Sequence, residues 1–283
     1  MAFAMPVEAQ AGGFEIPDHG ARALGRGGAY AVGAKDLTAM HYNPATMAKF
    51  RGTRFMLTHN SIYQNMVYSR APIADGWTQG SGNDVGGTTF DPVTNGTPWF
   101  LLGAMAVISS DFGLDNATFY AGMHGPSAVG RHYYPDYGSQ AFMLTQMNVI
   151  TVFYHLGGAW KYHSKKKGRD IFGIGGSIAL AQLPNMEYGL LVDNSQVANV
   201  DDPYDFGIFR PLPSDDPMDL QGVTTLTLKD TTGISGNAGV WYRPIPALEL
   251  GLAGRVIPTN FSPTGGLSLV TANPDDDLPV DEV

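Results

Sequence analysis

Apolar and polar residues alternate with a period of two through much of the chain. In Val223–Tyr242 the even positions are mostly apolar and the odd positions mostly polar, and Asp230 and Thr232 interrupt the apolar side. Ala247–Pro258 and Gln146–Tyr162 repeat the pattern. Residues two apart lie on the same face of a strand, so these segments predict amphipathic β-strands.

The pattern predicts seven strands after residue 53. The other four are Thr53–Ser69, Trp99–Ser109, Ala117–His124 and Ile171–Gln182. Tight turns alternate with long connections at 71–98, 125–141 and 184–222, which are rich in Gly, Pro, Asp and Asn. Outer-membrane barrels have this asymmetry, with short periplasmic turns and long external loops. We therefore expect an all-β fold, an antiparallel transmembrane β-barrel whose apolar face meets lipid and whose polar face lines the lumen.

One alternative to a transmembrane barrel is that the apolar face forms the core of a soluble antiparallel barrel or sandwich. Bacterial single-chain barrels use even numbers of strands, whereas seven are found here, and the chain closes on an acidic stretch, 271–283. On that basis we expect the chain to be the N-terminal part of a longer barrel or a truncated relative.

Residues 12–52 lack strand alternation and carry helix signals instead. Asp18 and Asp36 can each cap a short helical turn, and Asn43 followed by Pro44 is a further helix start. Helices this short are unstable alone, so the segment needs a surface to pack against. It is therefore expected to form a separate helical unit ahead of the barrel at 53–283.

Residues 1–11 end in Ala9-Gln10-Ala11, which fits a signal-peptidase site. We interpret them as the remnant of a secretion signal, with an ordinary disordered N-terminus as the alternative. On the first interpretation, the mature chain starts near Gly12 and leaves the cytoplasm.

Composition narrows the function classes. The net charge is −9, from 17 basic and 26 acidic residues, which makes nucleic acid an unfavourable partner. The absence of cysteine excludes disulfides, thiol catalysis and cysteine zinc sites. The glycines at 25–28 have no preceding strand and no following Gly-Lys-Ser/Thr, so they do not form a phosphate loop. The seven histidines accompany no nucleophile motif, which disfavours an enzyme such as an outer-membrane lipase.

Four motifs occur in order along the chain. They are Gly13-Phe14, the glycine-rich run at 25–33 (GRGGAYAVG), Asn43-Pro44-Ala45 just before the first strand, and Gly233-x-x-Gly236-Asn237-Ala238-Gly239-Val240-x-Tyr242. With a helical segment followed by a meander, the chain resembles the FadL/TodX family of outer-membrane transporters of long-chain fatty acids and aromatic hydrocarbons. Members of that family have fourteen strands, so this chain supplies about half of them.

The resemblance implies uptake of a hydrophobic small molecule across the outer membrane of a Gram-negative bacterium. The segment 12–52 is similar to the family's hatch, which plugs the barrel. The family's ligand leaves sideways through a gap at an inwardly kinked third strand. Gly122, Gly125 and Pro126 are suited to such a kink, with an ordinary strand end that leads into a loop as the alternative. The expected partners are a hydrophobic ligand, outer-membrane lipid and lipopolysaccharide. A monomer without cofactor or metal is expected, and a general porin or structural barrel is the main alternative function.

Candidate site residues follow from the same resemblance. Asn43, Pro44 and Ala45 match the hatch motif, and we expect them to cap a helix and fix the hatch to the wall rather than bind ligand. Phe14 and Ile16 would lie against the ligand pocket or simply pack within the hatch. His155, Lys229 and Arg255 are expected to project into the lumen. Polar lining is their default role, although one of the cations could meet a fatty acid carboxylate. Glu249 is a candidate ion-pair partner of Arg255.

Overall fold

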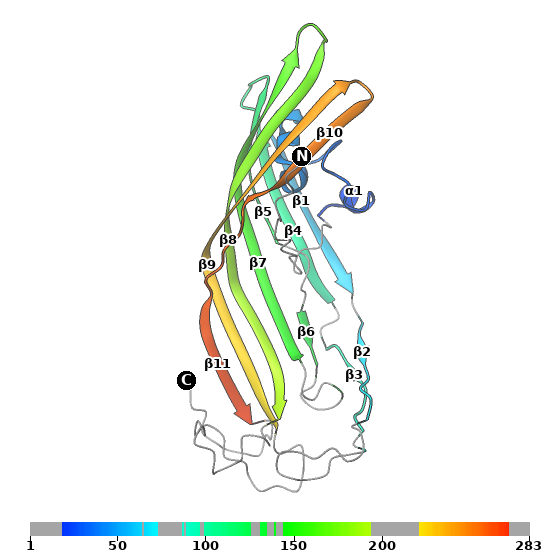
Figure 1. Ribbon diagram of the computed structural model, residues 1–283, viewed down its shortest axis with the longest axis vertical. Coiled ribbons are helices and arrows are strands. Elements are labelled where there is room, and N and C mark those ends of the chain that lie inside the picture. Colours follow the sequence, from blue (N-terminus) through cyan, green and yellow to red (C-terminus); the bar gives the residue numbers. More distant parts are fainter. Residues whose placement is uncertain are drawn as a thin grey trace, which may run out of the picture.

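The computed structural model describes residues 19–63, 65–72, 87, 89–96, 99–125, 131–134, 139, 144–193 and 221–271. It is dominated by one long, twisted antiparallel sheet, with a small helical unit packed against one of its faces (Figure 1). None of the helices in these ranges is long and apolar enough to cross a membrane.

The main strands follow chain order across the sheet. They are β1 (Arg54–Tyr63), β4 (Trp99–Ser110), β5 (Ala117–His124), β7 (Leu144–Ser164), β8 (Arg169–Asp193), β9 (Gln221–Ile245) and β10 (Leu248–Ile257). Two of the shorter strands lie within segments predicted as loops: β6 (Arg131–Tyr133), which pairs with β7, and β3 (Val93–Thr94), which pairs with β2 (Val67–Tyr68) at the end of the predicted strand Thr53–Ser69. β11 (Thr264–Thr271) pairs with β9 beyond the part that β10 covers. The predicted antiparallel all-β fold is confirmed, and β8 continues about ten residues past its predicted end.

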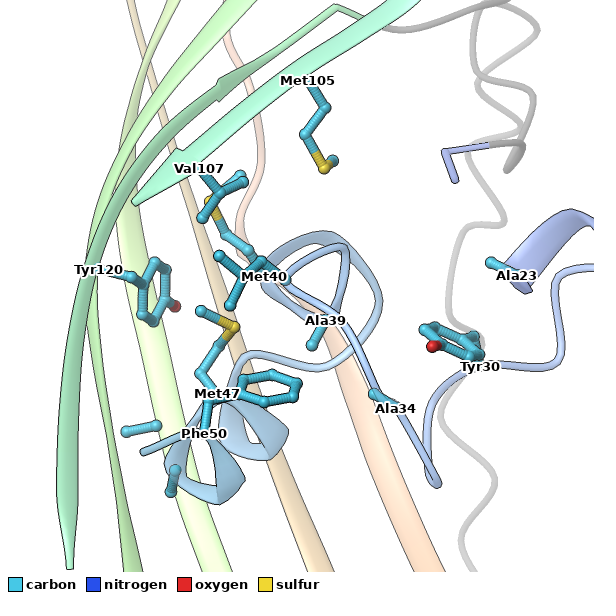
Figure 2. Close-up of a cluster of buried hydrophobic side chains, with 13 residues drawn as sticks. Ala23, Tyr30, Ala34, Ala39, Met40, Met47, Phe50, Met105, Val107 and Tyr120 are labelled. Atoms are coloured by element: carbon cyan, nitrogen blue, oxygen red, sulfur yellow. The ribbon is translucent and has the colours of Figure 1, made fainter. Parts of the chain in front are cut away.

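Residues 19–52 form the helical unit, called here the N-terminal segment. It contains α1 (Ala21–Leu24), α2 (Ala39–Tyr42) and the 3₁₀ helix η1 (Pro44–Lys49). α1 is preceded by Gly20 without a side-chain cap, whereas η1 is capped by Asn43, as its sequence predicts. Met40 and Met47 of this segment pack against Met105, Val107 and Tyr120 of β4 and β5 (Figure 2).

The sheet has two distinct ends. Short connections at 111–116, 165–168 and 246–247 join consecutive strands at one end, called here the turn end, and the long connections lie at the other, the loop end. The N-terminal segment packs at the turn end, uppermost in Figure 1. We call the sheet face that it contacts the inner face, and the opposite one the outer face.

At the turn end the outer face is apolar and the inner face small or polar. Leu156, Ile178 and Leu252 are 72%, 63% and 74% exposed on the outer face, whereas Ser177 and Ala179 are buried on the inner face. This is the alternation predicted from the sequence. On β8 the apolar outer stretch runs from residue 172 to residue 180, close to the about 9–11 residues that a tilted strand needs to span a membrane.

The alternation reverses toward the loop end. From Val152 to Ile150 on β7, the paired residue on β8 moves from Gln182 to Asn185, so β8 carries one extra residue there. β9 likewise carries an extra residue between Gly233 and Asp230. Each such bulge moves all following side chains to the other face. Pro184 lies in the first bulge, a usual place for proline within a sheet, because proline lacks a ladder donor.

As a result, the inner face of the loop end is apolar. Paired residues of antiparallel strands share a face, which places the following side chains together: Met147 and Val149 of β7, Met186, Tyr188 and Leu190 of β8, Leu226 and Leu228 of β9, and Leu267 of β11. The outer face there is polar, and Gln146 Nε2 donates to Glu187 Oε1 at 2.8 Å across β7 and β8. The expectation of a polar lumen-facing side therefore holds at the turn end only.

Candidate functional site

Asn43 fastens the N-terminal segment to the sheet. Its side-chain oxygen accepts the N–H of Ala45 at 3.1 Å and thereby caps η1. Its Nδ2 donates to the carbonyl oxygens of Ala31 at 2.8 Å and Val240 at 3.1 Å. Asn43 is fully buried, so each of these bonds is costly to lose. Trp241 adds a second attachment through its Nε1–H, which donates to the Ala45 carbonyl at 3.0 Å.

Glycines on three neighbouring strands make room for this motif. A Cβ on Gly175 of β8 would lie 2.7 Å from Ala45 Cα, and one on Gly239 of β9 would overlap Asn43 Oδ1. A Cβ on Gly251 of β10 would overlap Val32 of the N-terminal segment. The motif at residues 43–45 therefore rests on a wall from which side chains are missing, and it serves attachment in this structure.

Charged side chains close the edge of this interface. Glu249 of β10 forms ion pairs with Lys49 of η1 and with Arg243 of β9, rather than with Arg255 as expected. Lys49 also lies 4.6 Å over the Trp241 ring. Burial lowers the pKa of Lys49, and the hydrogen bond to Glu249 opposes this shift.

Within the part of the chain that the structure describes, the ladder on one side of β7 has an unpaired stretch between β5 and β6, called here the break. The pairing of β5 with β7 ends at Phe153, and the pairing of β6 with β7 begins at Asn148. Residues 149–152 of β7 therefore have no ladder partner on that side among the described residues. On the other side, Gly125 donates its N–H to the Ala104 carbonyl of β4 at 3.1 Å, so the contact with β4 continues to Gly125.

Gly122 lies before this break, in a regular part of the ladder. It pairs with Val107 of β4 and His155 of β7. A Cβ there would lie 2.8 Å from Met40 Sδ and 2.8 Å from the Ala106 carbonyl oxygen. Gly122 thus admits the N-terminal segment rather than a kink. Pro126, the third residue of the predicted kink, lies outside the described residues.

The three expected lumen cations separate in the structure. His155 and Arg255 lie on the inner face, and the Arg255 guanidinium is 5.4 Å over the Phe153 ring. Lys229 lies on the outer face, because it follows the β9 bulge and Asp230 has taken the inner position. This corrects the prediction for Lys229. Phe14 and Ile16 lie outside the described residues.

A cluster of histidines escaped the sequence analysis. His19 and His41 of the N-terminal segment meet His124 of β5, with ring centroids 4.6–5.0 Å apart. His155 Nε2 is 3.0 Å from His124 Nδ1, and His155 Nδ1 is 3.2 Å from Ser177 Oγ. Burial lowers the pKa of His41 to about 3, so its ring is neutral at neutral pH. No local motif signals this cluster, because its members come from four separate parts of the chain.

An apolar outer band, tight turns at one end and a helical unit docked on the inner face define the wall of a plugged outer-membrane β-barrel. The family model described as outer membrane protein transport protein (OMPP1/FadL/TodX) matches residues 3–162, and the chain belongs to that family. The family resemblance predicted from the sequence motifs is confirmed. The family is one of outer-membrane transporters of Gram-negative bacteria, not of enzymes.

A solved structure agrees with this assignment at the level of the fold. The crystal structure of a Pseudomonas aeruginosa FadL homologue is similar to the chain with a TM-score of 0.61 and 16% identity. The match covers 85% of this chain and 52% of that one, so the chain spans about half the length of the homologue. No curated protein sequence gives a significant match.

Proposed function

We propose that this protein takes up hydrophobic small molecules, long-chain fatty acids or aromatic hydrocarbons, from outside the cell. The reversal of the apolar face at the loop end carries the proposal. In a regular transmembrane strand the inner side would stay polar along its whole length. Here the loop end places Met186, Leu226 and Leu228 inward and Glu187 and Thr227 outward. Such a surface offers an apolar solute a favourable place inside the barrel, about 25 cal/mol for each Å² removed from water.

The N-terminal segment acts as the hatch that closes the periplasmic end. It covers the inner face only at the turn end, where short connections mark the periplasmic side. Asn43, Trp241 and the Glu249 ion pairs hold it there, and its apolar side packs on β4 and β5. A solute that moves along the apolar inner face from the loop end therefore meets the hatch before it reaches the periplasm.

We place the sideways exit at the break beside β7. It lies beside His124 and Phe153, at the level where the hatch begins. On the outer face next to it is a shallow groove of about 360 Å³. Its lining includes Phe55, Ile108, Ala121, Met123 and Tyr154. A hydrophobic solute that leaves here enters lipid without crossing water.

A matched pair of neighbours tests the uptake route. Leu226 and Thr227 are adjacent on β9 but lie on opposite faces. In cells that depend on this protein for uptake, Leu226→Glu should reduce entry of oleate and toluene about tenfold, because a charge replaces apolar surface worth about 1.5–3 kcal/mol. Thr227→Glu should stay within about twofold at equal surface amounts. Equal effects of the two substitutions would refute the inner apolar route.

The exit has a separate test. Gly125→Trp fills the start of the break, where even a Cβ lies 3.2 Å from the Thr151 carbonyl oxygen. Uptake of oleate should fall while Gly266→Trp, made at a glycine with open space around it, leaves uptake unchanged. Normal uptake by Gly125→Trp, alongside impaired uptake by Leu226→Glu, would place the exit elsewhere.

A further inference from the structure

Three histidine rings face one another between the N-terminal segment and the sheet. His19 precedes α1, His41 belongs to α2, and His124 is the last residue of β5. Their interplanar angles are 71°, 84° and 68°, so the rings stand nearly perpendicular to one another rather than stacked. One ligand nitrogen from each ring lies within 4.8 Å of the others.

This geometry matches that of three imidazoles around one tetrahedral metal ion. With zinc–nitrogen bonds of about 2.0–2.1 Å, the ring centroids in such a site are about 5 Å apart. The observed centroid separations are 4.6, 5.0 and 4.9 Å. The ligand nitrogens need to approach by no more than about 1.5 Å to reach tetrahedral spacing, which small rotations of the side chains can supply.

Two buried ring nitrogens in the cluster are relevant to ligand binding. His41 Nδ1 and His124 Nε2 are buried, and neither makes a hydrogen bond within the described residues. Buried polar atoms of this kind normally have a partner, and one that lacks it calls for an explanation. His124 itself is 1% exposed. A metal ion at the centre of the three rings would satisfy both nitrogens at once.

His124 also has the second contact that metal-bound histidines require. Its other nitrogen, Nδ1, lies 3.0 Å from His155 Nε2, and His155 in turn reaches Ser177 Oγ. Such outer partners fix the ring orientation and the tautomer of a metal-binding histidine. The chain His124–His155–Ser177 engages Nδ1 of His124 and therefore leaves Nε2 as the nitrogen that can bind an ion.

We propose that His19, His41 and His124 bind one divalent transition-metal ion of the zinc type and that this ion fastens the N-terminal segment to β5. Neutral imidazole suits zinc, copper, nickel and cobalt, and three protein ligands leave a fourth position for water. The positive charge of Arg255 lies nearby and opposes the binding of a cation. Its guanidinium lies over Phe153, and the Phe153 ring stacks on His124. Because β5 ends at His124, the ion would also hold the C-terminal end of β5. This site does not depend on which solute the protein carries.

Direct metal binding tests the proposal. The full-length protein, purified in detergent without a histidine tag, is titrated with Co²⁺ and with Zn²⁺. We expect one ion per chain, with the intense visible bands of tetrahedral cobalt, and a rise of the thermal unfolding midpoint on addition of Zn²⁺. His41→Gln and His124→Gln keep the size of the side chains and should weaken binding at least 100-fold. His155→Gln, which removes only the outer contact, should weaken it about 10- to 100-fold.

His163 provides the matched control. Its ring is 53% exposed on β7 and lies 2.8 Å from Asp170, away from the cluster. His163→Ala should leave binding and the zinc-dependent rise in the midpoint unchanged. Absence of tetrahedral cobalt bands in the wild type would overturn the proposal. So would unchanged affinity in folded His41→Gln or His124→Gln, and so would loss of binding in His163→Ala alone, which would indicate a surface site.

Discussion

The turn end and the loop end of this sheet use the same strands for opposite surroundings. At the turn end, apolar side chains such as Ile178 cover the outside, and small or polar ones such as Gly239 receive the N-terminal segment inside. At the loop end, Leu226 and Met186 face inward while Thr227 and Glu187 face outward. One wall thus meets lipid on the outside at one level and offers an apolar surface on the inside at another.

The difference shows how little sequence change a reversal of faces requires. β7 achieves it by composition alone, since Gln146 and Asn148 occupy the outer positions that Tyr154 and Leu156 occupy further along. β8 and β9 achieve it with one extra residue each, because a strand has a side-chain period of two. Apolar and polar residues can therefore alternate in both halves of a strand while the apolar side chains change from the outer to the inner face.

The largest expected effect is at the attachment of the N-terminal segment. A valine side chain at Gly239 would overlap Asn43 Oδ1 and displace the buried hydrogen bonds of that residue. Gly239→Val should lower the free energy of unfolding by about 3 kcal/mol or more, from overpacking together with unsatisfied polar atoms. Urea unfolding of the protein in lipid vesicles measures this.

Gly266 supplies the loop-end counterpart to that substitution. An added Cβ at Gly266 meets no atom within 4 Å. Gly266→Val should change the unfolding free energy by no more than about 0.5 kcal/mol. Similar losses for both variants would mean that the turn end is not specially filled.

An arginine on the outer face should cost more at the turn end than at the loop end. Ile178 and Asn185 both lie on the outer face of β8, on either side of the bulge. Ile178→Arg should cost about 2–4 kcal/mol if it lies near the bilayer midplane, whereas Asn185→Arg should cost about 0–1 kcal/mol. The comparison of their unfolding free energies in vesicles locates the membrane boundary along one strand. A larger cost at Asn185 would reverse our assignment of the two ends.

Much of the turn end follows from sequence, because local patterns govern it. Alternation in Gln146–Tyr162 and Val223–Tyr242 gives the strands and their faces, and Asn43-Pro44 gives the capped helix. The loop end is harder, since the interruption at Asp230 and Thr232 gives no sign of whether the strand bulges or merely carries two polar residues. For that reason the alternation predicts the wrong face for Lys229.

The histidine cluster was beyond sequence reasoning for a different cause. His19 and His155 lie far apart in the chain, and no spacing rule joins them to His41 and His124. Their meeting depends on the docking of the N-terminal segment against β5, which is a tertiary event. Each histidine is ordinary in the sequence, and only the packed interface brings His19, His41 and His124 within ligand distance of one another.

A smaller effect is expected from one hydrogen bond at the turn end. Trp241→Phe keeps one aromatic ring but removes the rest of the indole, including the N–H that donates to the buried Ala45 carbonyl at 3.0 Å. The loss should be at least about 1–2 kcal/mol, because the carbonyl loses its partner and the smaller ring also leaves buried space unfilled. The neighbouring Tyr242 points outward and is 48% exposed, so Tyr242→Phe should cost less than about 0.5 kcal/mol. Equal costs would show that the bond to Ala45 contributes nothing to attachment.

The smallest effect concerns acid. Asp111, in the turn between β4 and β5, accepts the N–H groups of Gly52 at 2.8 Å and Gly113 at 3.0 Å and pairs with Arg51. The hydrogen bond from Gly52 is the main cause that lowers the pKa of this carboxyl below its usual value. A lowered pKa in the folded state means that the contribution to stability is present above about pH 4 and is lost as the pH falls through the lower, folded value.

The thermal midpoint of the wild type should therefore fall on acidification below about pH 4, and Asp111→Asn should lower the midpoint at neutral pH and flatten that fall. Asp115, whose side chain is 99% exposed, serves as the control, and Asp115→Asn should preserve the wild-type profile. An unchanged acid profile in Asp111→Asn would show that the junction between the N-terminal segment and β1 does not depend on this carboxylate.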